Sequence, residues 1–310
     1  MVGKIIAVIL AFSILAFSIG LLYQNLPGET QFFSIQEEHE QEIIPISYGP
    51  TPVFSEKLRF NHNRISFYIN PSCSQERKNS MLEAFSIFQN KMGIINFYEL
   101  ESPNADIIVE CPDKIIEVRE GYMAAGEGGP SEIIETDLFN VINKGKIFIY
   151  DDSRCDYPIV EMHELLHVFG FNHTDNPKSA MYPISDCEQR ITSDMVETIQ
   201  SLYTVVPLTD IYIQNLSATK SGRYLDFNIT IKNEGLLDAP PTKLTIFSKG
   251  KLIDEIEIEG IKIGAGRTIQ IRNMKMFSRN IEEVEFAIDI DNLIRELDRE
   301  NNYKIMILSQ

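Results

Sequence analysis

Three of the chain's five histidines lie close together, in the segment HELLHVFGFNH at residues 163–173. Residues four positions apart share one face of a helix, so His163 and His167 can direct two imidazole nitrogens at one metal ion. Gly170 permits a backbone conformation that is closed to other residues, which would end the helix and let His173 return as a third ligand. Three neutral histidines leave a fourth zinc position open for water, which is the arrangement of a catalytic site.

Glu164 stands three residues before His167 and would point to the same side of the helix. There it can reach a metal-bound water without being a ligand. Zinc lowers the pKa of such a water to about 7, and Glu164 would accept its proton during attack on a polarised carbonyl. The alternative is an amphipathic core helix that happens to carry histidines. A core helix needs neither a glutamate beside two histidines nor a third histidine six residues on, so the metal site is favoured.

The segment fits H-E-x-x-H-x-x-G-x-x-H, the signature of the metzincin zinc peptidases. Met181, Tyr182 and Pro183 follow His173, and this stretch resembles the methionine turn of the family in its matrixin version. The resemblance implies that Met181 packs as a floor beneath the zinc and that Glu164 is the general base. The extra tyrosine ligand of astacins is absent, because its position is occupied by Pro183.

The elements that must position this segment follow in matrixin order. We expect strands at 64–70, 105–111 and 146–152, a helix at 75–90, and a closing helix at 194–203 capped by Thr192, Ser193 or Asp194. The resemblance extends over most of residues 60–204 and implies an α+β catalytic domain, with a twisted mixed sheet over the zinc helix. In the family a substrate adds as a strand to a sheet edge. Residues 122–129 are the candidate edge, although Gly128, Gly129 and Pro130 would equally suit an ordinary turn.

Three departures separate the chain from the animal matrix metalloproteinases. Only His39 and His62 lie upstream as ligands for a second, structural zinc, so we expect that site to be missing. No cysteine-switch sequence precedes the catalytic region, so latency through a thiolate on the zinc has no support. The histidines of the matrixin edge strand are absent as well. The resemblance is therefore to a matrixin-like metzincin outside that subfamily.

Four cysteines, Cys73, Cys111, Cys155 and Cys187, all lie in the predicted catalytic domain. An even number in an exported domain suggests two disulfides, with three pairings open. We favour Cys73–Cys111 and Cys155–Cys187, because the second pair flanks the predicted zinc helix and methionine turn. A zinc site of four thiolates is disfavoured, since no C-x-x-C pair exists.

The amino terminus predicts export. Residues 5–22 form an uncharged run after Lys4. The run is about 18 residues long, which can just span a bilayer, whereas cleaved signal peptides usually have about 7–15 apolar residues. The length favours a signal anchor at 1–24 over a cleaved signal peptide, and Lys4 predicts that the rest of the chain is exported. Residues 25–55, acidic and punctuated by proline, would form a stalk or short pro-segment.

Beyond residue 204 the pattern changes to alternating strands. They are expected at 210–218, 224–233, 243–250, 251–260, 268–274, 284–290 and 303–308. Such spacing predicts an all-β antiparallel sandwich at 205–310 that follows a catalytic domain at 56–204. The segments ITIKNEG (229–235), Gly-Ala-Gly (264–266) and DIDNLIRELDRENN (289–302) resemble the CARDB domain, a cell-adhesion-related module of bacterial and archaeal surface proteins.

The CARDB resemblance implies a domain that positions the enzyme or binds a cell-surface partner. Its acidic ending, residues 289–302, suggests calcium but lacks EF-hand spacing. Turns tied by aspartate and asparagine side chains are the favoured alternative.

The net charge of −17 disfavours nucleic acid and anionic lipid surfaces as partners. The sequence therefore predicts an exported zinc endopeptidase with one catalytic ion and with protein or peptide substrates, held at the membrane by its N-terminal helix, or secreted if that helix is cleaved. The alternative is a surface adhesion or binding protein whose metzincin domain holds zinc but turns over little. A zinc hydrolase for another acyl group is a third hypothesis, because the choice of peptides rests on family resemblance.

Overall fold

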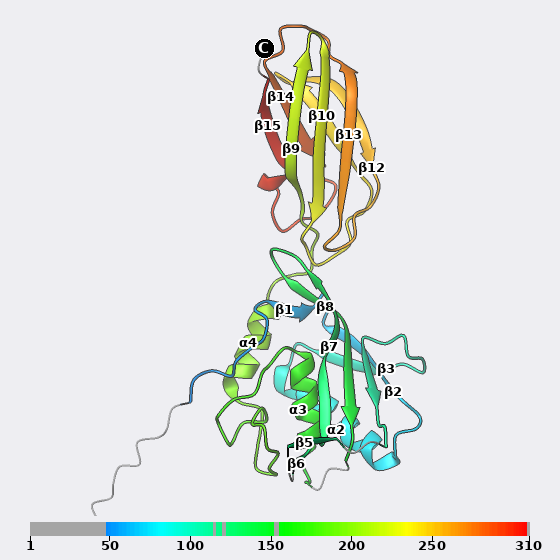
Figure 1. The fold of residues 1–310 in the computed structure, drawn as a ribbon, viewed down its shortest axis with the longest axis vertical. Coiled ribbons are helices and arrows are strands. Elements are labelled where there is room, and N and C mark those ends of the chain that lie inside the picture. The colour runs from blue at the N-terminus through cyan, green and yellow to red at the C-terminus, as the bar shows by residue number, and fades with distance from the viewer. Residues whose placement is uncertain (1–47, 114–115, 120–121, 152–154, 309–310) are drawn as a thin grey trace, which may run out of the picture. The chain divides into compact units, whose positions relative to one another are not determined.

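A computed structural model of the chain describes residues 48–308, except 114–115, 120–121 and 152–154 (Figure 1). The predicted signal anchor and most of the predicted stalk lie outside these residues. Within them, no helix combines the length and the apolar character that crossing a membrane requires.

The first part of the described chain is built on a six-stranded mixed sheet. Its strands are β1 (Leu58–Phe60), β2 (Arg64–Ile69), β3 (Asn96–Glu99), β4 (Ile107–Glu110), β7 (Gly126–Glu135) and β8 (Asn140–Ile149). Strand β8 pairs in parallel with β1 and β4, β4 pairs in parallel with β2, and β2 with β3. The antiparallel strand β7 pairs with β8 along its other side. A small separate ribbon pairs β5 (Glu117–Arg119) with β6 (Tyr122–Met123).

Three helices accompany this sheet: α2 (Gln75–Met92), α3 (Ile159–Val168) and α4 (Ser193–Tyr203). Helix α2 begins where the Ser74 side chain accepts a hydrogen bond from the Arg77 N–H, and it ends at Gly93 in the left-handed conformation. Helix α3 packs against β7, β8 and α2. A cluster of stacked and edge-on rings, including Phe67, Phe85 and Phe88, fills the core between sheet and helices.

The strands predicted at 64–70, 105–111 and 146–152 correspond to β2, β4 and the last part of β8. Strands β1 and β3 were not predicted, because each is too short for a period-two pattern to emerge. The alternative reading of 128–130 as an ordinary turn is wrong: these residues lie within β7 and pair with Ile147, Lys146 and Gly145 of β8. Helix α4 begins after Thr192, whose side chain makes no capping hydrogen bond.

The buried side chain of Arg59 fastens β1 to the end of α4. Its Nη1 donates to the Leu202 carbonyl at 2.5 Å and to the Val205 carbonyl at 2.9 Å, and its guanidinium lies 4.3 Å from the centre of the Tyr203 ring. The first and last elements of this part of the chain are therefore held together by one cation.

The second part of the described chain consists of two antiparallel sheets. One has the order β13 (Gly266–Lys275), β10 (Tyr224–Asn233), β9 (Ile211–Ser221), and the other has the order β12 (Lys251–Ile258), β11 (Thr242–Ser248), β14 (Glu283–Ile288), β15 (Tyr303–Ile307). Phe227 and Phe286, one from each sheet, meet edge-on in the shared core, with ring centres 5.1 Å apart. All seven strands expected in this region are present, with boundaries shifted by a few residues.

Two of the segments that resemble CARDB have structural roles. The fully buried Asn233 accepts hydrogen bonds from the N–H groups of Asp210 and Gly235 and donates to the carbonyls of Leu237 and Ile261. In the segment 289–302, the Asp289 carboxylate accepts hydrogen bonds from the N–H groups of two later residues of the turn that begins at Asp289. These bonds match the aspartate-tied turns favoured from the sequence, and calcium stays an untested prediction.

Candidate metal centre

Helix α3 carries His163, Glu164 and His167 within the core of the first domain. Nine of its ten residues are buried. The chain leaves the helix through Gly170, which has φ of +94°, a left-handed conformation that favours glycine. A Cβ at Gly170 would also lie 2.7 Å from Cδ2 of Leu58. This turn brings His173 back over the helix, as the sequence predicted.

The structure brings the three histidines together through their Nε2 atoms. The distances between these atoms are 3.1 Å for His163 and His167, 3.2 Å for His163 and His173, and 3.3 Å for His167 and His173. Among the described residues, this is the one group of three or more histidines, cysteines or acidic residues close enough to hold a metal ion.

Backbone carbonyl oxygens orient two of the rings through contacts with their Nδ1 atoms. His163 Nδ1 lies 2.6 Å from the Ala180 oxygen, and His167 Nδ1 lies 2.7 Å from the Phe171 oxygen. Because a carbonyl oxygen only accepts, each Nδ1 carries the proton and each Nε2 presents a lone pair. Nitrogen lone pairs converging on one point repel one another unless a cation lies between them. The tetrahedral geometry of zinc, with bonds of about 2.0–2.1 Å to nitrogen, implies nitrogen separations of about 3.3 Å, so the three histidines fit this ion.

The surroundings of the histidines keep their rings neutral. Burial, followed by the charge of a protonated His167, lowers the pKa of His163 to about 3. Burial also lowers the pKa values of His167 and His173 below the usual value. Since metal binding requires neutral imidazole, all three rings are ready to act as ligands at neutral pH without first losing a proton.

Glu164 lies next to the histidines and against the edge strand. It is 6% exposed, and burial, with smaller contributions from Glu127 and Glu161, raises its pKa to about 8. Strand β7 passes directly over it: a Cβ at Gly126 would lie 2.8 Å from Glu164 Oε1, and one at Gly128 would lie 2.3 Å from the Glu164 carbonyl oxygen. The strand can run this close to α3 because both positions are glycine.

The close packing of Gly126 and Gly128 against α3 was not predicted from the sequence. Their alternation in GEGG places both on one face of a strand, and that pattern is the signal that could have revealed a close approach of two backbones.

Met181, predicted to lie beneath the metal, is fully buried. Its N–H donates to Oγ of Ser179, and its carbonyl accepts from the N–H of Thr174 at 3.0 Å. Thr174 directly follows His173, so this bond joins the loop that carries the third histidine to the segment whose Ala180 carbonyl orients the first.

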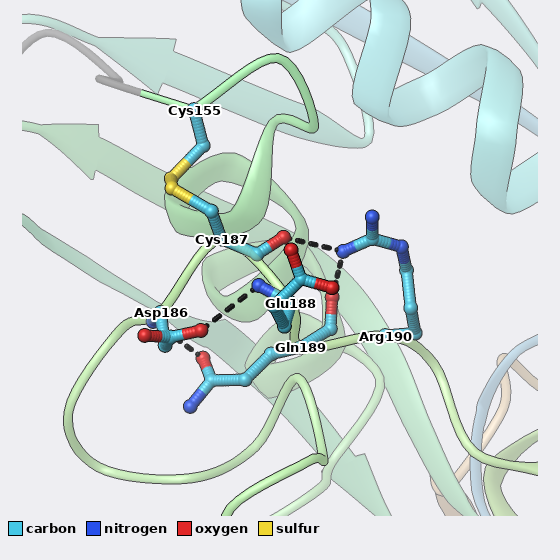
Figure 2. Close-up of a disulfide and its surroundings, with 6 residues drawn as sticks. All are labelled: Cys155, Asp186, Cys187, Glu188, Gln189 and Arg190. Atoms are coloured by element: carbon cyan, nitrogen blue, oxygen red, sulfur yellow. Dashed lines mark hydrogen bonds between the residues drawn. A yellow bond between two sulfur atoms is a disulfide. The ribbon is translucent and has the colours of Figure 1, made fainter.

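The cysteines pair as Cys73–Cys111 and Cys155–Cys187, the pairing favoured from the sequence. The first disulfide ties the start of α2 to the end of β4. The second ties the segment before α3 to the loop after Met181 (Figure 2). His62, considered as an upstream ligand, lies 3.7 Å from an oxygen of Asp106 and is not part of the histidine cluster; His39 lies outside the described residues.

Comparisons with known proteins match the two parts of the chain separately. Residues 59–204 match the family model described as Matrixin, and residues 208–306 match the model described as CARDB. Stromelysin-2 of Rattus norvegicus is 23% identical over an aligned length of 210 residues, and the match covers 60% of this chain and 41% of that protein. The chain thus spans about two fifths of the length of this curated relative.

Solved structures that this chain is similar to include two domains of about one third of its length. The CARDB domain of the PF1109 protein from Pyrococcus furiosus is 14% identical, covers 33% of this chain and 90% of that one, and has a TM-score of 0.27. A domain of a cell surface protein from Methanosarcina acetivorans is 13% identical, covers 33% and 94%, and has a TM-score of 0.29.

Apart from Leu58 at the start of β1, the mixed sheet, helix α3 and the cluster of three histidines that could hold a metal ion all lie within the residues that match the Matrixin model. Residues 59–204 therefore form a matrixin-like domain and residues 208–306 a CARDB-like domain, as the two family matches show.

Proposed function

We propose that this chain is an exported zinc endopeptidase that hydrolyses peptide bonds with the help of Glu164. The observation that carries the proposal is the convergence of three Nε2 atoms at 3.1–3.3 Å, with two of the rings held in the ligand tautomer by carbonyl oxygens. His163, His167 and His173 would hold one zinc ion. When bound, zinc supplies a water of lowered pKa and polarises the carbonyl of the scissile bond.

Glu164 is proposed as the general base. It would take the proton of the attacking water and pass it to the leaving amine. For this it must be ionised, although burial raises its pKa to about 8 when the centre carries no added charge. A dipositive charge at the three Nε2 atoms would favour the carboxylate, since an opposite charge nearby lowers the pKa of an acid.

The edge strand β7 is proposed to hold the substrate. Among the described strands, β8 is the only one that pairs with β7, so the backbone of β7 has a second side to offer. A peptide adding there as a further strand would lie beside Glu164, because Gly126 and Gly128 of β7 pack against that residue. Within the predicted edge 122–129, we propose that residues 126–129 of β7 bind the substrate. Residues 122–123 are excluded because they form β6, which pairs with β5 in the separate ribbon.

Export is supported by the two disulfides, which form and persist in oxidising compartments. We propose the predicted layout as the working arrangement: anchor or signal peptide at 1–24, stalk or short pro-segment at 25–55, peptidase at 56–204 and β domain at 205–310. In this arrangement the CARDB-like domain positions the peptidase or binds a cell-surface partner.

The test compares the unchanged chain with Glu164→Gln, which keeps the size of the side chain and removes the base. Bound zinc is measured by mass spectrometry, and cleavage is followed on casein. We expect one zinc per chain in both proteins and cleavage by the unchanged chain only. Zinc in both proteins with cleavage by neither would favour the surface-binding alternative. Equal cleavage by both would contradict the role of Glu164.

A further inference from the structure

The loop that follows Met181 contains a set of bonds that the proposed reaction does not use. We propose that Gln189, Arg190 and the Cys155–Cys187 disulfide form a clamp that holds the Ala180 carbonyl against Nδ1 of His163. The clamp thereby sets how His163 is presented to a metal ion. This inference deepens the proposed function and rests on it in one respect, that His163 is a ligand.

The backbone of Ala180 connects the clamp to His163 through two hydrogen bonds, one made by its N–H and one made by its carbonyl. The Ala180 N–H donates to the Arg190 carbonyl at 2.8 Å, and the Arg190 N–H donates to the Lys178 carbonyl at 3.0 Å. The Ala180 carbonyl then accepts from His163 Nδ1 at 2.6 Å. Since Ala180 is fully buried, no water takes the place of these partners. The position of the Arg190 backbone therefore determines the position of the oxygen that orients His163.

The Arg190 backbone is fixed by its own side chain and by the disulfide. Its Nη1 donates to the carbonyls of Cys187 and Gln189, at 2.6 and 2.7 Å, as Figure 2 shows. Its guanidinium lies 4.3 Å from the centre of the Tyr157 ring, and Cys187 is bonded to Cys155. Two separate contacts thus join 187–190 to 155–157, the segment that leads into helix α3. The clamp connects the start of the helix that carries His163 to the carbonyl behind that histidine.

The buried side chain of Gln189 holds the loop of residues 177–189 together. It is 1% exposed, and every bond of its amide goes to the backbone. Nε2 donates to the carbonyls of Ile184 at 2.8 Å and Pro177 at 3.3 Å, while Oε1 accepts from the Asp186 N–H at 2.9 Å. Both N–H donors of this buried amide and one lone pair of its oxygen are thus used inside one loop. Its role is to position the loop that carries Ala180.

Such a clamp is expected to act on metal affinity. The group behind a ligating histidine fixes its tautomer and ring orientation, and loss of such partners typically costs about 10–100-fold in affinity. His167 provides an internal contrast, because its Nδ1 bonds to Phe171 at the end of α3, outside the clamp. We therefore expect the clamp to control one of the three ligands.

The two disulfides provide a matched pair of variants. Cys155→Ser/Cys187→Ser opens the clamp, while Cys73→Ser/Cys111→Ser opens the other disulfide; the two pairs are separated by 32 and 38 residues. The loop-closure entropy lost is therefore nearly equal. The full chain carrying each pair is titrated with zinc against a competing chelator, and its thermal unfolding midpoint is measured. We expect zinc affinity to fall about 10–100-fold in the first variant. In the second we expect only the midpoint to fall.

A second variant serves if the first does not fold. Gln189→Met keeps a side chain of similar length and removes the amide, and we expect it to weaken zinc binding about tenfold. Equal zinc affinity in the unchanged chain and the clamp variants would overturn the clamp alone, as would an equal loss in both cysteine variants. If the unchanged chain binds no zinc, the proposed function fails with it.

Discussion

Replacing Gly128 by alanine should disturb the proposed active site while leaving all of its chemical groups in place. The added Cβ would lie 2.3 Å from the Glu164 carbonyl oxygen and 2.8 Å from both its carbonyl carbon and its Cα. All three atoms belong to the backbone, so no side-chain rotation relieves the contact. Carbon atoms in contact normally stay about 3.5–4.0 Å apart, so β7 and α3 must separate by roughly 1 Å.

Separating β7 from α3 should lower both the stability of the chain and the rate of the proposed peptide hydrolysis. Overpacking of a filled core typically destabilises a protein by about 1–3 kcal/mol. A displacement of about 1 Å between substrate and catalytic group can lower a rate about 100-fold, and here the strand proposed to hold the substrate would move away from the proposed base. We expect urea unfolding of Gly128→Ala to show the first loss, and kcat/KM on casein at saturating zinc to show the second.

Gly129→Ala is the matched control. It lies next in the same strand and also pairs with β8, but nothing comes within 4 Å of its added Cβ. We expect this variant to stay within about 0.5 kcal/mol of the unchanged chain, as surface substitutions usually do. Unfolding of the two alanine variants at the same urea concentration would contradict the close packing of Gly128 against α3. A lower stability without a lower rate would refute only the placement of the substrate along β7.

Three further predictions concern other parts of the first domain. Gly170→Ala should lower the free energy of unfolding by about 1–3 kcal/mol, because its φ is +94° and Leu58 fills the space beside it; unchanged thermal melting would contradict this. Burial alone would raise the pKa of Asp106, but bonds with His62 and Ser66 outweigh it and leave this pKa below its usual value. The stability that this carboxylate contributes is therefore fully present above about pH 4, the pKa of the unfolded chain. It is lost as the pH falls through the lower pKa of the folded chain. In urea titrations, Asp106→Asn should therefore destabilise the chain more at pH 7 than at pH 3. Zinc held at 100 times its Kd should raise the free energy of unfolding by about 2.7 kcal/mol, an increase that EDTA should remove and that Glu164→Gln should retain.

The cluster of three histidines could be predicted from sequence because its groups are close together in the chain and two of them follow the geometry of one helix. His163 and His167 share a helix face, and a glycine at position 170 is typical of the end of a helix. The strands of the second domain were predictable for a similar reason, since alternating burial over ten residues, as in β10, is visible in the letters.

What could not be predicted depends on contacts between distant segments. The need for glycine at 126 and 128 arises from α3, more than 30 residues later, and the local GEGG pattern does not identify the segment that approaches. Likewise the clamp of Gln189 and Arg190 consists of bonds to backbone groups, which have no sequence signature. A buried glutamine looks like an exposed one until the loop around it is folded.

The compactness of the metal centre along the chain has a consequence for the order of folding. All three histidines, the two carbonyls behind them and the clamp fall within residues 155–190, so closing this segment costs little chain entropy. The edge strand β7 is joined to β8 by a short turn, but its contact with Glu164 of α3 spans more than 30 residues. Contacts of short sequence separation tend to form first, so we expect the refolding chain to gain the ability to capture a metal ion before β7 packs against α3 and can present a peptide to Glu164. Refolding in the presence of zinc would show this as metal uptake ahead of casein cleavage.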